Sequence, residues 1–423
     1  MTVASRRRSA RWIPPEPLIF AQLAQFVSWL LLFVVGARGE FAASPDGFAW
    51  IHVVALGWLT TTALAFLIHI LPGFTDAEWR LESLARASLW IYQPGVVALV
   101  FGFVTWRPMW LMIGGVVVVA SIVAYLAAAA ATLLGAANSS DRATRAAVWA
   151  LGVTLGMLGL TASLGLCLAW ALDAGRLSEL RWPALHATLG IVGWLGILVL
   201  GVSVRTYNRL IGRSARRRVW HIATGSLSWI GLLALALGMA MPVRALALAG
   251  GSLLILAGAL YSFDTIRSLL AASARHLLPR AFIWASQIWL IVALLCALGI
   301  LFGNAALGPV YLFAFLMGWI GQAVNAHLSH VGIRLVTTIV LGDDDETPPG
   351  ALLDARVGFT SLLAYQAALA FGIAGLLLRS ATFLEIAAVL GVLGLAAMAA
   401  NVAIAVANAR RSRAFTSSSQ VSP

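Results

Sequence analysis

Long, uninterrupted runs of apolar residues make up most of this chain, and short polar segments separate them. Each run has about the 20 residues that a helix needs to cross the hydrocarbon core of a bilayer. Leu, Ala, Val and Gly dominate the runs, and none shows the ten-residue alternation of a membrane β-barrel. The pattern therefore predicts an all-α polytopic membrane protein with about twelve transmembrane helices. We predict spans at 17–37, 49–71, 88–105, 109–134, 146–172, 184–206, 219–240, 244–270, 281–302, 308–332, 357–378 and 383–407.

No linker divides the chain into separate domains. We predict an N-terminal cytoplasmic segment at 1–16, one twelve-helix transmembrane domain at 17–408 and a disordered cytoplasmic tail at 409–423. The first apolar run follows an arginine-rich start, as in a secretory signal, but its length and the lack of a small-residue cleavage site favour a retained helix. The acidic connection GDDDETPP at 342–349 is predicted to be a solvated loop.

Composition and charge support this class and orient the chain. Hydrophobic residues make up 61% and charged residues only 10% of the sequence, against about 25% charged in soluble domains. The formal charge is +12, and all 28 basic residues are arginines. Twenty-two of them fall at the two ends and in alternate connections, which is the positive-inside pattern. The other connections hold Arg38, Arg107, Arg176, Arg181, Arg244 and Arg379. We therefore expect a plasma or inner membrane protein with cytoplasmic termini, a lipid bilayer as its surroundings and no nucleic-acid partner.

A Gly–Trp pair recurs in the second, sixth and tenth spans. The pairs begin at Gly57, Gly193 and Gly318, at intervals of 136 and 125 residues, or about four helices each. The surrounding stretches read ALGWLTTTALAFLIH, IVGWLGILVLGVSVR and LMGWIGQAVNAHLSH. Repetition at a regular interval indicates a repeated structural unit. The sequence therefore predicts three pseudo-repeated sets of four helices. The three tryptophans are predicted to be packing residues.

The predicted topology gives each intramembrane histidine a depth. Such ionisable residues are costly in lipid and are often functional. His52 and His69 lie 17 residues apart in the second span, so about 25 Å separates them and they cannot share one metal ion. His52 and His186 are predicted at the outer side. The predicted inner group consists of His69, His221, His327 and His330.

Imidazole nitrogens are common ligands of haem iron and copper. His69 and His330, each 11 residues after a repeat tryptophan, could supply the two axial ligands of a haem. Arg205 and Arg334 lie at a similar depth and could pair with haem propionates, or could be anchors that reach the membrane surface. His327 could be a ligand or a hydrogen-bonding neighbour, and His221 could be an interfacial side chain. Asp264 is predicted to pair with Arg267, three residues later.

The chain resembles the catalytic subunit of haem–copper oxidases, and more closely their divergent relatives, the NnrS-type haem–copper membrane proteins of the nitric-oxide response. The stretches HVVALGWLTTTALAFLIHILPG and HATLGIVGWLGILVLGVSVR carry the resemblance. It implies a b-type low-spin haem between the second and tenth spans, and copper between the sixth and seventh. The implied ligands are His52 or His69 with His327 or His330 for haem, and His186 and His221 for copper. The depth prediction, however, puts His186 and His221 at opposite sides.

Three functions remain open from the sequence. The first is a haem-binding membrane protein, with or without copper, of respiratory electron transfer or nitric-oxide handling, with a redox partner or other membrane subunits. If it is an enzyme, it is an oxidoreductase. No catalytic residue is assigned. The second is a secondary transporter, although transporters usually repeat in halves and Asp264 lies near a span end instead of the midplane. The third is a non-catalytic accessory or assembly protein.

Overall fold

A computed structural model describes most of the chain. The described residues are 15–38, 41, 44–75, 77–137, 141–176, 182–211, 218–271, 277–341 and 349–419. The predicted N-terminal segment up to residue 14 and the acidic connection at 342–348 lie outside them. Within the described ranges the chain is helical and has no β-strand.

Twelve helices are long and apolar enough to cross a membrane, which confirms the predicted fold class. Three of the spans, the second, sixth and tenth, are made of consecutive shorter elements that include π-helical segments. Nine spans are single helices: α2 (Pro15–Arg38), α5 (Glu82–Thr105), α6 (Pro108–Ala136), α7 (Arg142–Asp173), α10 (Arg218–Ala240), α11 (Arg244–Leu270), α12 (Leu277–Leu301), α17 (Ala355–Leu378), which the short α16 (Pro349–Leu352) precedes, and α18 (Ala381–Ser419). The second span consists of α3 (Pro45–His52), η1 (Val53–Thr60) and α4 (Thr61–Thr75), and the sixth of α8 (Pro183–Thr188), η3 (Leu189–Gly196) and α9 (Ile197–Ile211). The tenth consists of η4 (Ala305–Leu307), α13 (Gly308–Phe313), η5 (Ala314–Ile320), α14 (Gly321–His327), η6 (Leu328–Gly332) and α15 (Ile333–Leu341).

Local sequence signals account for several helix boundaries. Pro45, Pro108 and Pro183 stand in the first turns of α3, α6 and α8, where a missing N–H has no cost. The Asp354 carboxylate caps α17 by accepting from the backbone N–H groups of residues 356 and 357 at 2.8 and 3.1 Å. Arg379 ends the same helix in the left-handed conformation.

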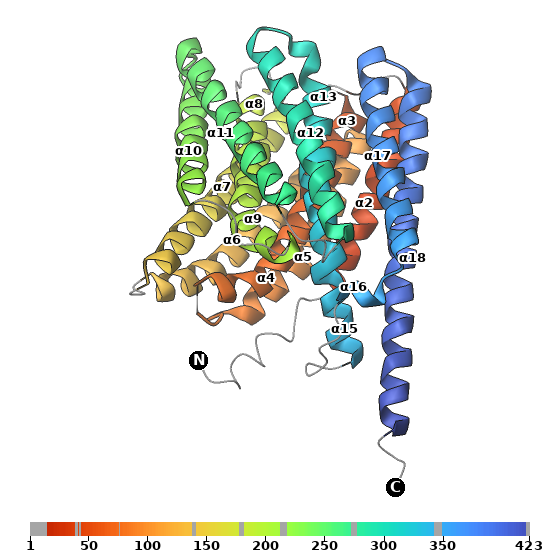
Figure 1. Cartoon of the computed structure of the whole chain (residues 1–423). Helices are drawn as coiled ribbons and strands as arrows, with labels where there is room; N and C mark the ends of the chain where they lie inside the picture. The colour runs from red at the N-terminus through yellow and green to blue at the C-terminus, as the bar shows by residue number, and fades with distance from the viewer. Residues whose placement is uncertain are drawn as a thin grey trace.

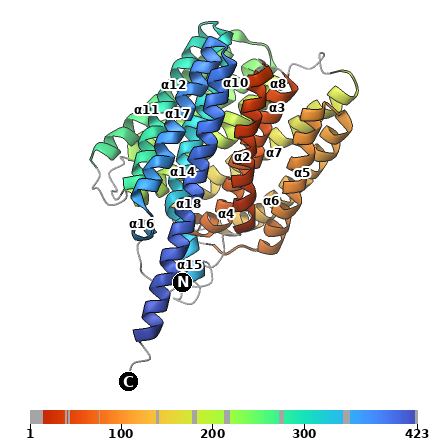
Figure 2. The same cartoon turned by 90° about the vertical axis from the view of Figure 1, so that its right-hand side faces the viewer.

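The packing of the helices has an order that recurs every four spans. The most extensive contacts join α5 to α6, α10 to α11 and α17 to α18, which are the third and fourth spans of the three sets that the sequence predicts. Each set then contacts the first helix of the next, through α6 with α7, α11 with α12 and α18 with α2. The contact between α18 and α2 closes the bundle, and Figure 2 shows these two helices, from opposite ends of the chain, side by side.

The second, sixth and tenth spans form the centre of the bundle. Of their most apolar windows, 72%, 50% and 67% of the residues are buried, against at most 44% for any other span. Lipid contact by the remaining helices explains this difference, because outer helices expose one apolar face. The candidate histidine ligands on these spans, His52, His69, His186, His327 and His330, are half-buried.

We name the two ends of the bundle by their position in Figure 1. The upper end carries α3 and α8, and the lower end carries α4, α9 and α15 (Figures 1 and 2). Helix α18 also extends beyond the lower end. It remains helical to Ser419, whereas composition predicts a disordered tail from residue 409. Residues 405–414 are mostly Ala and Arg, which favour helices, and a helix that has already started propagates at little cost.

Candidate cofactor sites

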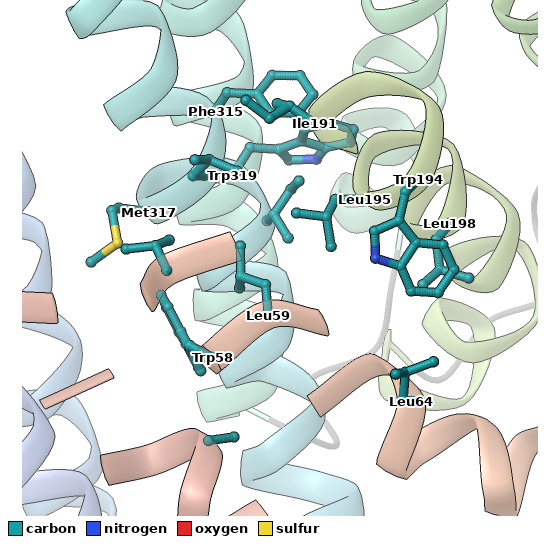
Figure 3. Close-up of a cluster of buried hydrophobic side chains, with 14 of the residues drawn as sticks. Trp58, Leu59, Leu64, Ile191, Trp194, Leu195, Leu198, Phe315, Met317 and Trp319 are labelled. Carbon is teal, nitrogen blue, oxygen red and sulfur yellow. The ribbon is translucent and has the colours of Figure 1, made fainter. Parts of the chain in front are cut away.

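Three π-helical segments, η1, η3 and η5, meet at the centre of the bundle. Each segment interrupts an otherwise α-helical span and places its Gly–Trp pair at its fifth and sixth positions. The sequence repeat therefore coincides with a backbone irregularity of a kind that is frequent at functional sites. Figure 3 shows Trp58, Trp194 and Trp319 among the buried side chains of this region, so the predicted packing role agrees with their burial.

Side chains from these segments bind the central spans to one another. The Trp194 indole N–H donates to the Thr60 hydroxyl over 2.9 Å, which joins η3 to η1. The ring of Trp58 packs directly over Gly321, which joins η1 to the start of α14. Because both contacts are buried, they hold the three spans in a defined arrangement.

A cavity of about 300 Å³ opens at the lower end between α4, α9 and the η6–α15 segment. It brings together three of the four histidines predicted for the inner group. Its volume is at the lower end of the range for small-molecule and cofactor pockets, which is about 300–1,000 Å³. Apolar side chains such as Phe66 and Val331 form the remaining walls. The polar residues that line the cavity are His69, Thr206, His327, His330 and Arg334.

Hydrogen bonds engage both ring nitrogens of His327. Its Nδ1 lies 2.7 Å from the carbonyl oxygen of Ala323, and its Nε2 lies 2.8 Å from the hydroxyl of Thr206. A carbonyl oxygen only accepts, so Nδ1 carries a proton. Metal ligation through Nε2 would therefore require the loss of the bond to Thr206. This geometry favours the hydrogen-bonding role that the sequence left open for His327.

At the upper end, the structure places His52 and His186 next to each other, as their predicted depth suggests. The ring centres are 6.3 Å apart and the ring planes differ by 18°. The Nδ1 of His52 donates to the Phe48 carbonyl over 2.7 Å, and the Nδ1 of His186 donates to the Thr161 carbonyl over 3.0 Å. Helices α3 and α8, of the second and sixth spans, thus place two imidazoles next to each other.

The remaining predicted residues lie elsewhere. His221 lines a second cavity, of about 340 Å³, together with Asp264 and not with the other inner histidines. Thr188, at the end of α8, contacts Met239 near the C-terminal end of α10, whereas His221 lies in the first turn of α10. The structure therefore does not bring together His186 and His221, the two copper ligands implied by the resemblance. Asp264 pairs with Arg267 over 3.1 Å, as predicted. Arg205 belongs to α9, and its side chain lies outside the described ones.

Sequence reasoning missed the buried polar groups that support these sites. Thr60 and Thr206 are inconspicuous in sequence because isolated threonines are common in membrane helices. Two hydrogen bonds also join α12, α17 and α14: the Trp289 indole N–H donates to the Gln366 side-chain carbonyl over 2.7 Å, and the Gln366 amide donates to the Gln322 side-chain carbonyl over 3.2 Å. Glutamine within an apolar span is the signal that could have identified these bonds, because an unpaired amide is costly in lipid.

Among the described residues, no group of three or more His, Cys, Asp or Glu side chains has the proximity needed to hold a metal ion. A site with three or four such protein ligands is therefore not formed by this part of the chain. A haem with two axial ligands needs only a pair of histidines, and His69, His327 and His330 line the lower cavity. The donor set of the cavity thus fits a bis-histidine haem.

These features define the class of the protein: it is an all-α, multi-pass membrane protein with a buried core of three π-helix-containing spans. In comparisons with known proteins, no family model matches the chain, and no curated protein matches it.

Proposed function

We propose that this chain is a membrane haem protein that binds b-type haem in the lower cavity, with His69 and His330 as axial ligands. The observation that carries the proposal is the shared lining of one cavity by His69, His330 and Arg334, on two of the three central spans. The haem would be held without a covalent link, as b-type haem is, because neither Cys167 nor Cys296 belongs to the C-x-x-C-H motif that covalent attachment needs.

Different residues of the cavity would contact different parts of the haem. His69 and His330 provide imidazole nitrogens from opposite elements, α4 and η6. Arg334, which is exposed at the mouth, provides a guanidinium for propionate groups. Thr206 holds His327 in place, and Phe66 and Val331 exclude water. Haem, when bound, supplies a one-electron redox couple whose potential depends on its axial ligands and on the surrounding dielectric.

Electron transfer is the activity that this arrangement supports best. A haem held by two histidines would leave no position open for a small ligand, so nitric-oxide handling would require one of the two histidines to be displaced. The arginine asymmetry puts the lower end, and both termini, on the cytoplasmic side of a plasma or inner membrane. A redox partner, or another membrane subunit, would therefore exchange electrons with this site from the cytoplasmic side.

Secondary transport is less well supported. The buried carboxylates among the described residues are those of Asp46 and Asp264, and each is paired with an arginine, Arg38 and Arg267 respectively. Paired carboxylates near span ends are poor candidates for a coupling-ion site at the midplane. An accessory or assembly role is the alternative that would remain if the protein bound no haem.

Absorption spectra of the purified protein test the proposal. Protein from haem-supplied cells is expected to show a Soret band, with sharp α and β bands after reduction by dithionite. His69→Ala and His330→Ala should each remove the low-spin spectrum, because each deletes one axial nitrogen. His221→Ala, in the neighbouring cavity, is the matched control and should leave the spectrum unchanged.

The outcomes are distinct. A colourless preparation of folded wild-type protein would refute haem binding. A spectrum that depends on His327 and persists in His330→Ala would show that the axial pair is wrong.

A further inference from the structure

Two cavities that the proposed haem site does not use lie one after the other along α10. We call them the His221 cavity, of about 340 Å³, and the Met239 cavity, of about 300 Å³, each after a residue that lines it. Ile197, Leu200 and Ser228 line both cavities, which therefore adjoin at these side chains. His221 and Met239 are 18 residues apart on α10, or about 27 Å. Together the cavities extend over nearly the ~30 Å thickness of a bilayer's hydrocarbon core.

The His221 cavity lies in a gap between two helices. Residues of α7, among them Ala146 and Ala150, form one wall, and the first half of α10 forms the opposite wall. Both helices pack on α9 and η3, but in the described part of the chain no extensive contact joins α7 to α10. Ile222, which lines the cavity from α10, is exposed on the surface of the bundle. The spaces between the outer helices of a bundle face lipid, so the cavity opens toward the acyl chains of the bilayer.

Polar side chains are concentrated in the His221 cavity. Those that line it are Thr154, His221, Thr224, Ser228, Tyr261 and Asp264. The Met239 cavity is lined mainly by Leu and Ile side chains, with glycine at positions 251 and 258. Thr188 is one of its few polar residues, and its hydroxyl donates to the Ala184 carbonyl of its own helix over 2.9 Å. The combined space therefore suits a molecule with a polar end in the first cavity and an apolar chain in the second.

A charged pair stands at the polar end of this space. Asp264 is buried and lines the His221 cavity, and it accepts a hydrogen bond from Arg267 over 3.1 Å. Arg267 is half-buried and lies three residues before α11 ends at Leu270, in the part of a span that meets the lipid headgroups. A guanidinium has five N–H donors and matches the oxygens of a phosphate, so it can contact a carboxylate and a phosphate at the same time.

We propose that the two cavities bind one phospholipid of the leaflet at the lower end, with its phosphate at Arg267 and one acyl chain along α10. Ser228 and Met239 are 11 residues apart, or about 16 Å, and an acyl chain covers half of the hydrocarbon core, about 15 Å. The chain gains little by leaving lipid, because both surroundings are apolar. The phosphate contact therefore gives the selectivity, and the site prefers a phospholipid to an uncharged lipid with the same chains.

Native mass spectrometry of delipidated full-length protein in detergent tests the phosphate contact. The probe is phosphatidylglycerol with palmitoyl and oleoyl chains, and one saturable lipid per chain is expected. Diacylglycerol with the same chains should bind about 10-fold more weakly or worse, because a hydrogen bond to a charged group is lost. Arg267→Gln should weaken the binding of phosphatidylglycerol by a similar factor. Arg86→Gln, which breaks the pair of Arg86 with Glu82 on α5, is the matched control and should bind like the parent.

A second variant tests the position of the acyl chain. Gly225 lines the His221 cavity, and a Cβ atom there would meet nothing within 4 Å. Gly225→Phe puts an aromatic ring into the open space, so it should abolish the saturable binding while the protein still elutes as folded in size-exclusion chromatography. Gly156, on α7, also has nothing within 4 Å of a Cβ atom and lines neither cavity. Gly156→Phe should therefore bind the lipid like the parent.

Equal lipid binding by Gly225→Phe and Gly156→Phe would overturn the proposal, as would diacylglycerol that binds as tightly as phosphatidylglycerol. Phosphatidylglycerol with a photoactivatable group at the end of one acyl chain provides a measurement that needs no variant. Cross-links near Met239 and Gly251 are expected, and cross-links confined to helices that line neither cavity would contradict the proposal. His69→Ala, which removes only a haem ligand, should bind the lipid like the parent. Failure of the lipid site therefore leaves the haem proposal intact, and the reverse also holds.

Discussion

Replacement of Trp194 by alanine is expected to destabilise the protein by about 3–5 kcal/mol, the usual cost of deleting a buried tryptophan side chain. Trp194 is 2% exposed and lies where the three central spans meet (Figure 3). Its loss opens a cavity between η1 and η3 and breaks the bond to Thr60. Trp149, which is 69% exposed on α7, is the matched control, and Trp149→Ala should change stability little.

The hydrogen-bond part of this effect can be measured separately. Trp194→Phe and Thr60→Val each remove one partner, and a double-mutant cycle between them isolates the bond. We expect a coupling of about 0.5–1.5 kcal/mol, since interhelical hydrogen bonds in membranes average about 0.6 kcal/mol and reach about 1.7. Unfolding of the purified protein by sodium dodecyl sulfate provides the free energies. Equal stability of Trp194→Ala and the parent would show that the central spans do not depend on this contact.

Gly250→Ala is expected to destabilise the hairpin of α10 and α11 by about 1–3 kcal/mol or more. A Cβ atom at this position would lie 2.2 Å from the backbone nitrogen of Leu235, and a backbone cannot move aside as a side chain can. Small residues at helix contacts allow this close approach in membranes, where packing replaces the hydrophobic effect as the driving force.

Gly225, on α10 of the same hairpin, is the matched control. A Cβ there meets nothing within 4 Å. Gly225→Ala should be neutral, or stabilising by up to about 1 kcal/mol because it reduces the freedom of the unfolded chain. Thermal stability followed by size-exclusion chromatography distinguishes the two variants. Indistinguishable melting of Gly250→Ala and Gly225→Ala would contradict the close contact.

The histidine positions show how far sequence reasoning reached. Hydropathy and a helical rise of about 1.5 Å per residue give each residue a depth, and depth alone places His52 level with His186. The same reasoning puts His221 with His69, His327 and His330. The structure assigns His221 to a different cavity, because residues of equal depth can lie on different sides of a bundle. Depth is a one-dimensional property, whereas lateral position depends on which helices are neighbours.

The Gly–Trp pairs show a different limit. Their recurrence every four helices is visible in the sequence, and it predicts that the three spans have equivalent roles. It does not predict that each pair lies within a π-helical segment. In η1, the Leu56 carbonyl accepts from the Thr61 hydroxyl of the same span at 2.9 Å and from the Tyr92 hydroxyl of α5 at 3.2 Å. Tyr92 belongs to the next span, and sequence alone does not bring it to this carbonyl.

The sequence by itself determined the class of the protein, its twelve spans and the place of each ionisable side chain along its span, because insertion into lipid depends on the length and polarity of local segments. Only the tertiary structure decided which spans are central, which histidines share a cavity, and that His327 is engaged by Thr206. These depend on the shapes of side chains on helices far apart in sequence. The fit between side chains of different helices exists only in the assembled bundle, whereas hydropathy is a property of each segment alone.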